Sequence, residues 1–293
     1  MTAPILVIGA TGQIGENVMR QAEGRVALAL ARDPSRVRAS PATLVQRIET
    51  SHGLPNVPAA WPASAISTLP VWMLPDFVAP MAGHGVRRLV CFSTTSIFGK
   101  SGTRSPREHA VVQQVREAEA KLGELADRRD VGLTILRPTL IYGEGADKTI
   151  AAAARFIERF GVYPVHGCAR GKRQPVHAAD LATAALATLE TGVAVGREYA
   201  LGGGETLDYR TMIARVFEVL GKPSRIVRVP FLPQMLSVAG ALSPGSELTG
   251  DVARRMNADL DFDDGTASRD FGYAPRAFLS GGRRDLFGAP RSG

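Results

Sequence analysis

The chain has 293 residues, 45% of them hydrophobic, which is the composition of an ordinary globular protein with enough material for a substantial core. Its net charge is +7, but the 35 basic residues are scattered, so we expect a solvated basic surface and no nucleic-acid binding. Two cysteines without partner spacing indicate neither a disulfide framework nor a metal site. The first strand begins at once and no apolar run reaches membrane length, so we expect a cytoplasmic protein without a membrane partner.

Residues 5–15, with the sequence ILVIGATGQIG, predict a strand, a tight turn and a helix. Glycines spaced G-x-x-G-x-x-G let backbone amides approach a pyrophosphate, and the start of the helix adds a positive dipole and unpaired N–H donors. A phosphate-bearing cofactor is therefore expected here, and a strand-to-helix turn without a ligand is the alternative. The residues expected to contact the cofactor are Gly9, Ala10, Thr11, Gly12, Gln13 and Ile14.

A second buried strand is predicted at residues 25–31, and the side chains after it are expected to meet the adenosine ribose. An acidic side chain there accepts hydrogen bonds from the ribose hydroxyls, whereas an arginine pairs with a 2′-phosphate. Asp33 has another role as an N-cap before Pro34. Arg32, with Arg36 one turn later, therefore favours NADP, with NAD as the alternative. Arg32 could equally be a solvated loop residue.

The next segments alternate between predicted strands and helices. Strands are expected at residues 43–49, 65–69, 88–93 and 133–143, and an irregular connection at 53–62. Helices are expected at 110–126 and at 71–81, the latter interrupted by Pro75 and Pro80. Such alternation predicts a parallel sheet with right-handed crossovers. Because ligands bind at the carboxyl ends of parallel strands, Thr68, Leu69, Ser93 and Pro138 join the expected cofactor contacts.

Further elements follow beyond residue 145. Helices are predicted at residues 150–160, 181–189 and 209–220, and strands at 198–201 and 226–229. The Gly- and Arg-rich segment from Gly281 is expected to be disordered.

Five segments in this order resemble the extended short-chain dehydrogenase/reductase superfamily, in particular its NAD-dependent epimerase/dehydratase-like proteins. They are GATGQIG at residues 9–15, FSTTSIFG at 92–99, TILRPTLIYG at 134–143, PVHAADLA at 175–182 and YALGGGETLDYRTM at 199–212. The resemblance implies an α/β fold in which residues 1–145 form an NAD(P)-binding Rossmann core with a doubly wound parallel sheet. It also implies that residues 146–293 form mainly a smaller C-terminal α/β substrate lobe, with part of the chain returning to the core.

The resemblance also implies a catalytic set: a Ser or Thr after the fifth strand, and a Y-x-x-x-K pair on the next helix that exchanges the proton. Thr94 falls at the Ser/Thr position. The pair is missing, because all five tyrosines lie at or beyond residue 142 and none has a lysine four residues later. Val111 and Val115 align with the pair, so the standard mechanism cannot be carried over. The chain resembles an atypical member.

His109, just before that helix, is the candidate substitute because an imidazole titrates near neutrality; a surface histidine is the alternative. Tyr142 is a second candidate, although the family's tyrosine-glycine pair at this place is usually structural. His177 and Asp180 resemble a family motif that helps to fix the second lobe. None of these residues suggests a metal site or a catalytic triad.

The leading hypothesis is an NAD(P)-dependent oxidoreductase acting on an unidentified small molecule, with Thr94 and either water or His109 handling the proton. One alternative is a non-catalytic protein that senses the nucleotide or serves in an assembly. Another is a sugar-nucleotide epimerase or dehydratase, which the missing pair weakens most. Helices on the outer faces of the sheet would allow a homodimer.

Overall fold

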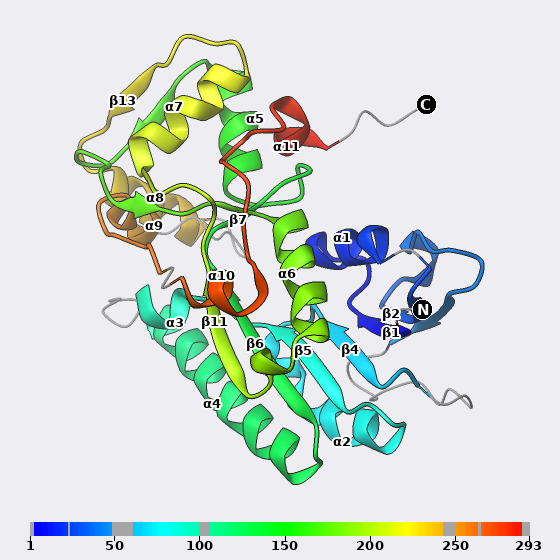
Figure 1. The fold of residues 1–293 in the computed structure, drawn as a ribbon. Helices are drawn as coiled ribbons and strands as arrows, with labels where there is room; N and C mark the ends of the chain where they lie inside the picture. The colour runs from blue at the N-terminus through cyan, green and yellow to red at the C-terminus, as the bar shows by residue number, and fades with distance from the viewer. Residues whose placement is uncertain are drawn as a thin grey trace.

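The computed structural model describes residues 3–22, 24–48, 61–99, 106–242, 250–262 and 265–288. Its centre is a seven-stranded parallel sheet with the order β11-β6-β5-β4-β1-β2-β3 (Figure 1). The strands are β1 (Ile5–Ile8), β2 (Val26–Ala31), β3 (Leu44–Arg47), β4 (Ser64–Ser67), β5 (Arg88–Phe92), β6 (Gly132–Pro138) and β11 (Arg197–Leu201). The order reverses at β1, since the chain passes from β1 to β2 and β3 and then returns to β4 on the other side. The predicted doubly wound Rossmann sheet is confirmed.

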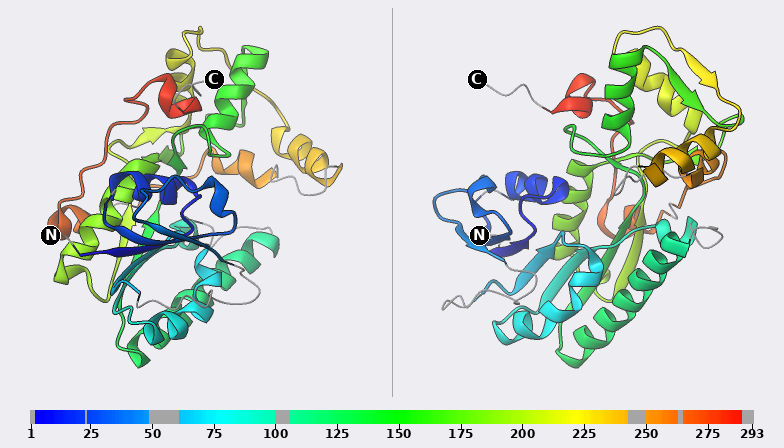
Figure 2. Two further views of the ribbon diagram at one scale, coloured as in Figure 1. Left: turned by 90° about the vertical axis from the view of Figure 1, so that its right-hand side faces the viewer. Right: turned by 180° about the vertical axis from the view of Figure 1, so that it is seen from behind.

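Helices cover both faces of this sheet (Figures 1 and 2). One face carries α1 (Gln13–Gln21) and α6 (Ala178–Glu190), and the other carries α2 (Pro75–Gly83) and α4 (Pro106–Arg128). Alternate side chains of β1 serve the two sides, because successive residues of a strand point to opposite faces. Ile5 and Val7 pack in the core under α1 and α6, and Leu6 and Ile8 pack in the core under α2 and α4. This explains why the run is apolar at every position.

A second lobe with its own hydrophobic core follows β6. Its elements are β7 (Ile141–Tyr142), α5 (Ile150–Phe160), β8 (Tyr163–Val165), β9 (Lys172–Arg173), β10 (Val176–His177), β12 (Leu207–Asp208), α7 (Tyr209–Val219), β13 (Ile226–Arg228), α8 (Leu232–Leu242), α9 (Gly250–Arg255) and α11 (Arg283–Phe287). The short strands pair β10 with β7, β12 with β9 and β13 with β8. Between these segments the chain returns to the sheet with α6, β11 and α10 (Thr266–Phe271).

The structure refines the expectations about local structure at several places. The helix expected at residues 71–81 is divided at Pro75, as expected, into the 3-10 turn η2 (Val71–Met73) and α2, which begins at Pro75 because proline fits the first turn of a helix; Pro80, the second expected interruption, lies inside α2. The described part of the segment from Gly281 is ordered, since residues 283–287 form α11 and Asp285 accepts a hydrogen bond of 2.9 Å from the Gly281 amide; residues 289–293 lie outside the described residues. Most of the expected connection at residues 53–62 lies outside the described residues.

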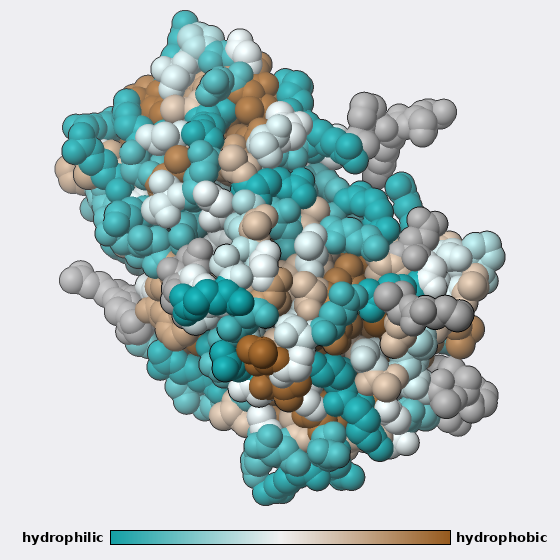
Figure 3. All heavy atoms as spheres, viewed as in Figure 1, coloured by the Kyte–Doolittle hydropathy of each residue, from teal (hydrophilic) through white to brown (hydrophobic). Residues whose placement is uncertain are grey.

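Short turns complete the described chain: η1 (Pro34–Arg36), α3 (Ser96–Gly99) and η3 (Gly192–Ala194). Figure 3 shows a surface that is mainly hydrophilic on the face it presents, with small hydrophobic areas. Among the described helices, none combines the length and the apolar character needed to span a bilayer.

Candidate functional site

The glycine-rich turn joins β1 to α1 where the strand order reverses. Gly9 has a φ of +84°, a left-handed conformation that favours glycine. Its carbonyl oxygen accepts hydrogen bonds of 2.9 Å from the Gly12 amide and from the Thr68 hydroxyl. A Cβ on Gly15 would lie only 2.2 Å from the same oxygen. The glycines therefore let α1 pack directly against the turn.

The first turn of α1 offers free backbone donors. Gly12 is the N-cap and supplies no side-chain acceptor, and no described group accepts a hydrogen bond from the amides of Gln13 and Ile14. Unpaired amides at a helix N-terminus carry partial positive charge and bind anions such as a diphosphate. The residues present therefore fit the diphosphate of a dinucleotide.

The other expected cofactor contacts lie at the ends of β4, β5 and β6. The Thr68 hydroxyl holds the Gly9 turn, so it supports the turn instead of facing open space, while the Leu69 side chain packs into the core under α2. The Pro138 carbonyl accepts hydrogen bonds from the amide and the hydroxyl of Thr95, at 3.1 and 3.0 Å. The Ser93 hydroxyl oxygen is buried without a hydrogen-bond partner in the described structure. A buried hydroxyl without a partner is uncommon in folded proteins, so Ser93 carries hydrogen-bonding capacity that the described residues do not use.

Basic residues gather at the end of β2. Arg32 is exposed, and the Asp33 carboxylate accepts hydrogen bonds from the Ser35 amide and hydroxyl, at 3.2 and 2.6 Å. The hydrogen bond from the Ser35 hydroxyl is the main reason why the pKa of Asp33 is lowered. Glu16, in the first turn of α1, has a raised pKa, chiefly because the carboxyl group is partly buried; the positive charge of Arg36 acts in the opposite direction. The Asp33 carboxylate, which is next to Arg32 in the sequence, is thus already occupied by its hydrogen bonds from Ser35.

Thr94 and His109, the predicted catalytic residues, are not joined by any interaction in the described structure. The Thr94 hydroxyl oxygen accepts a hydrogen bond of 3.1 Å from the Ser96 amide, and His109 is exposed on α4. Val115 is 1% exposed in the core under α4, while Val111 is 41% exposed. Both side chains are aliphatic, so neither can exchange a proton whatever its exposure.

Tyr142 is a structural residue. Its side chain is fully buried, and its hydroxyl oxygen accepts a hydrogen bond of 3.1 Å from the Leu279 amide. Burial raises the pKa of Tyr142 further above its usual value, and its ring makes edge contacts with His177 and Phe278. A phenol with a raised pKa is a poor base near neutrality.

Arg137, at the end of β6, joins α4 to β11. Its guanidinium contacts the buried Glu119 carboxylate of α4 at 2.7 Å and the half-exposed Glu198 carboxylate of β11 at 2.5 Å. It also lies 5.5 Å from the centre of the Phe98 ring. This pairing fixes α4 against the carboxyl ends of the strands.

The glycine-rich turn between β1 and α1 (the nucleotide turn) also contacts the second lobe, and the sequence did not predict this contact. The Gln13 side chain donates a hydrogen bond of 2.7 Å to the Gly143 carbonyl oxygen. Gly143 has a φ of +126°, and a Cβ there would lie 2.6 Å from Nε2 of His177. Arg20 of α1 pairs with Glu144 at 2.6 Å. The local signal for this junction was the glycine at position 143.

No group of described residues has the composition of a metal site. The two cysteines are separate, with Cys91 buried in the sheet and Cys168 exposed.

Comparison with known proteins gives the family context. Residues 76–202 match the NAD dependent epimerase/dehydratase family. An uncharacterized protein of Sinorhizobium fredii is 27% identical over 205 residues, which cover 66% of this chain and 50% of that protein. The mitochondrial NADH dehydrogenase [ubiquinone] 1 alpha subcomplex subunit 9 of Arabidopsis thaliana is 27% identical over 148 residues, covering 50% of this chain and 34% of the subunit. This chain thus spans half or less of the length of these two relatives.

Among solved structures, the UDP-glucuronic acid 4-epimerase from Bacillus cereus, in complex with UDP-glucuronic acid and NAD, superposes with a TM-score of 0.70. The two share 15% identity, and the match covers 97% of this chain and 98% of the epimerase. At this identity the match shows a common fold. Together with the match over residues 76–202, it confirms the resemblance that the sequence motifs indicated.

Proposed function

We propose that this chain, an epimerase/dehydratase-like protein of the extended short-chain dehydrogenase/reductase type, binds a nicotinamide dinucleotide and uses it as an oxidoreductase with an atypical active site. The observation that carries the proposal is the turn between β1 and α1, whose first helical amides lack acceptors among the described residues. The B. cereus epimerase, which shares this fold, forms a complex with NAD, and this supports a nicotinamide cofactor here.

Several groups of the chain would hold the cofactor and the substrate. The amides of Gln13 and Ile14 would bind the diphosphate, and Ser93 would offer its hydroxyl at the end of β5. A bound nicotinamide supplies hydride transfer, which depends mainly on positioning. The Thr94 oxygen accepts from the Ser96 amide, so its own O–H remains able to donate to a substrate oxygen. The proton would come from water or His109.

We propose NADP as the preferred cofactor, because Arg32 is exposed and the Asp33 carboxylate is occupied by Ser35. Arg32→Ala should weaken NADP binding by about tenfold or more, the value of one charge-assisted hydrogen bond, and leave NAD binding nearly unchanged. Arg228→Ala, which removes an exposed charge from β13, is the matched control. Equal losses for NADP and NAD in calorimetric titrations would contradict this preference.

Binding and turnover together test the proposed activity. Calorimetric titration with the oxidised and reduced forms of both cofactors should reveal a saturable complex, and a panel of quinones, aldehydes and ketones should show oxidation of NADPH. Thr94→Ala should lower the rate while cofactor binding persists. The absence of any complex at saturating nucleotide would overturn the proposal.

A non-catalytic role is the second candidate. It is favoured by the buried Val115 and Tyr142, which leave no proton-transfer pair, and by the similarity to an NADH dehydrogenase subunit. Tight cofactor binding without turnover across the panel would support a nucleotide-sensing or assembly role. A sugar-nucleotide epimerase or dehydratase is a third candidate, tested by thermal shifts with UDP-sugars. A homodimer and a cytoplasmic location remain predictions.

A further inference from the structure

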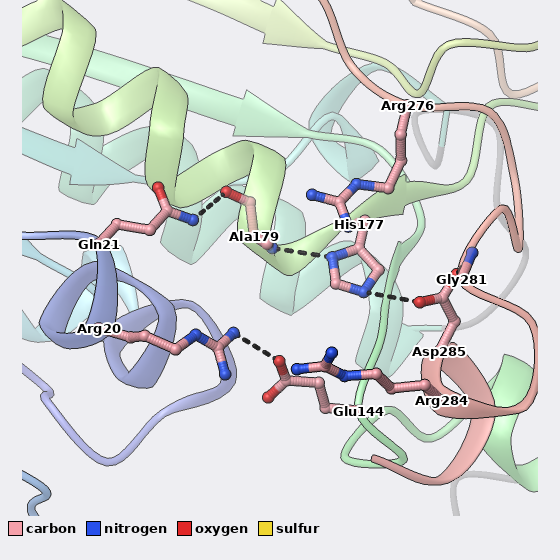
Figure 4. Close-up of a pocket in the computed structure, with 9 residues that line it drawn as sticks. All are labelled: Arg20, Gln21, Glu144, His177, Ala179, Arg276, Gly281, Arg284 and Asp285. Atoms are coloured by element: carbon pink, nitrogen blue, oxygen red, sulfur yellow. Dashed lines mark hydrogen bonds and ion pairs between the residues drawn. The ribbon is translucent and has the colours of Figure 1, made fainter. Parts of the chain in front are cut away.

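A cavity of about 270 Å³ lies beside α1 and outside the nucleotide turn (Figure 4). Its walls come from four segments far apart in the sequence: α1, the turn after β7, the start of α6, and the C-terminal stretch that ends in α11. Apart from two small residues, Ala179 and Gly281, every described residue that lines it is polar or charged. A molecule that fits this space is therefore small and polar.

The carboxylates around the cavity are more buried than the arginines with which they pair. The Arg20 side chain is 52% exposed and that of its partner Glu144 is 23% exposed. The Arg276 side chain is 40% exposed, whereas its partner Asp180, which it contacts at 2.8 Å, is 12% exposed. The cavity is therefore lined by three guanidinium groups and two carboxylates, and within these two pairs the guanidinium group is the more exposed partner.

Arg284 adds a third guanidinium group. It projects from α11 and forms no ion pair with any described residue. Figure 4 shows that Arg284 and Arg20 reach toward Glu144 from opposite sides. The neighbouring Asp285 also lines the cavity, but its carboxylate accepts a hydrogen bond from the Gly281 amide at 2.9 Å and lies 3.5 Å from Nε2 of His177, and it forms no ion pair with Arg284 in the described structure.

We propose that this cavity binds the phosphate group of a small molecule, held by Arg20, Arg276 and Arg284. The planar guanidinium donates two parallel hydrogen bonds, which match the oxygens of a phosphate. The cavity has room for the phosphate and a small organic remainder. A ligand held in this way ties α1 to α11 and so joins the two lobes behind the nucleotide turn.

The experiment measures binding of inorganic phosphate by calorimetry and thermal shift at constant ionic strength. Arg284→Gln should weaken binding at least about tenfold, as expected for loss of a charge-assisted contact. Arg283→Gln is the matched control, because it removes the same charge from the same helix while its side chain pairs with Glu158 at 2.8 Å instead of lining the cavity. Its affinity should equal that of the unmodified protein.

Two further arms separate this site from the nucleotide turn and identify the source of the phosphate. If Arg32→Gln abolishes phosphate binding and Arg284→Gln leaves it intact, the phosphate binds at the end of β2 beside Arg32, and the proposal is overturned. The absence of any saturable binding would overturn it as well. Glycerol 3-phosphate that binds more tightly than phosphate would indicate a phosphorylated metabolite, and equal affinities would indicate free phosphate. Either result supports the proposal only if Arg284→Gln abolishes the binding of that ligand. These outcomes do not depend on whether a dinucleotide binds.

Discussion

Replacing Gly15 by alanine would place a methyl group inside the turn between β1 and α1. The new Cβ would lie 2.2 Å from the Gly9 carbonyl oxygen and 3.0 Å from the carbonyl carbon. Gly9 cannot move aside freely, because its amide donates to Leu30 at 2.9 Å and its oxygen is held by Thr68 at 2.9 Å. The start of α1 must therefore move away from β1.

We expect Gly15→Ala to lower the free energy of unfolding by about 1–3 kcal/mol, the usual cost of overpacking a well-packed region. The affinity for the dinucleotide should fall at least about tenfold, because the amides that would bind the diphosphate lie on the displaced helical turn. Urea unfolding followed by circular dichroism measures the first effect, and calorimetric titration with NADP measures the second.

Gly123→Ala is the matched control for this variant. Gly123 lies within α4, and a Cβ added there meets nothing within 4 Å. Because alanine is favoured over glycine in a helix by about 0.5–1 kcal/mol, this control should be slightly more stable and bind normally. A Gly15→Ala protein with unchanged unfolding and unchanged affinity would refute the reasoning.

Three further predictions concern stability and reactivity. Arg137→Met should lower the free energy of unfolding by about 3–5 kcal/mol, because it leaves the buried Glu119 carboxylate unpaired. Glu198→Gln, which changes a side chain that is 50% exposed, should lower it by less than about 1 kcal/mol. Equal losses of the free energy of unfolding in urea titrations of the two variants would contradict this. Burial opposes ionisation of Asp285, but hydrogen bonds from the adjacent histidine and the Gly281 amide, with nearby positive charge, lower its pKa below the ordinary 3.8. A carboxylate with a lowered pKa stabilises the fold at pH values above its unfolded-state pKa, and this stabilisation is lost as the pH falls through its folded-state pKa. Asp285→Asn should therefore flatten the pH dependence of the free energy of unfolding below pH 3.8. An unchanged pH dependence of unfolding in this acid range would argue against it. Ellman's reagent should modify the exposed Cys168 in the folded protein and the buried Cys91, whose pKa is raised by burial, only after denaturation; rapid modification of both would be inconsistent with the structure.

The sheet could be predicted because its signals are local. The apolar run of β1 and the glycines at positions 9, 12 and 15 determine the turn without help from distant residues. Small errors arose where distant contacts intervene. The strand expected to reach residue 69 ends at Ser67, because Thr68 turns to bond with the Gly9 carbonyl.

The second lobe and its junction with the core could be predicted only in part. Several of its strands, such as β7 and β10, have two residues each and exist only because they pair across long stretches of sequence. Asp285 looked like part of a disordered, basic tail, yet it packs beside His177, which is more than 100 positions earlier in the chain. No local period records such a contact, and the cavity beside α1 was missed for the same reason.

The place of β11 in the sheet has a consequence for biosynthesis. β11 covers the outer edge of β6, but in the sequence it follows α5 and the first short strands of the second lobe. A nascent chain on the ribosome therefore carries an open β6 edge until Leu201 has emerged. An open strand edge is a template for pairing with another chain. A fragment that stops at residue 145 should consequently self-associate, even though it contains most of the sheet.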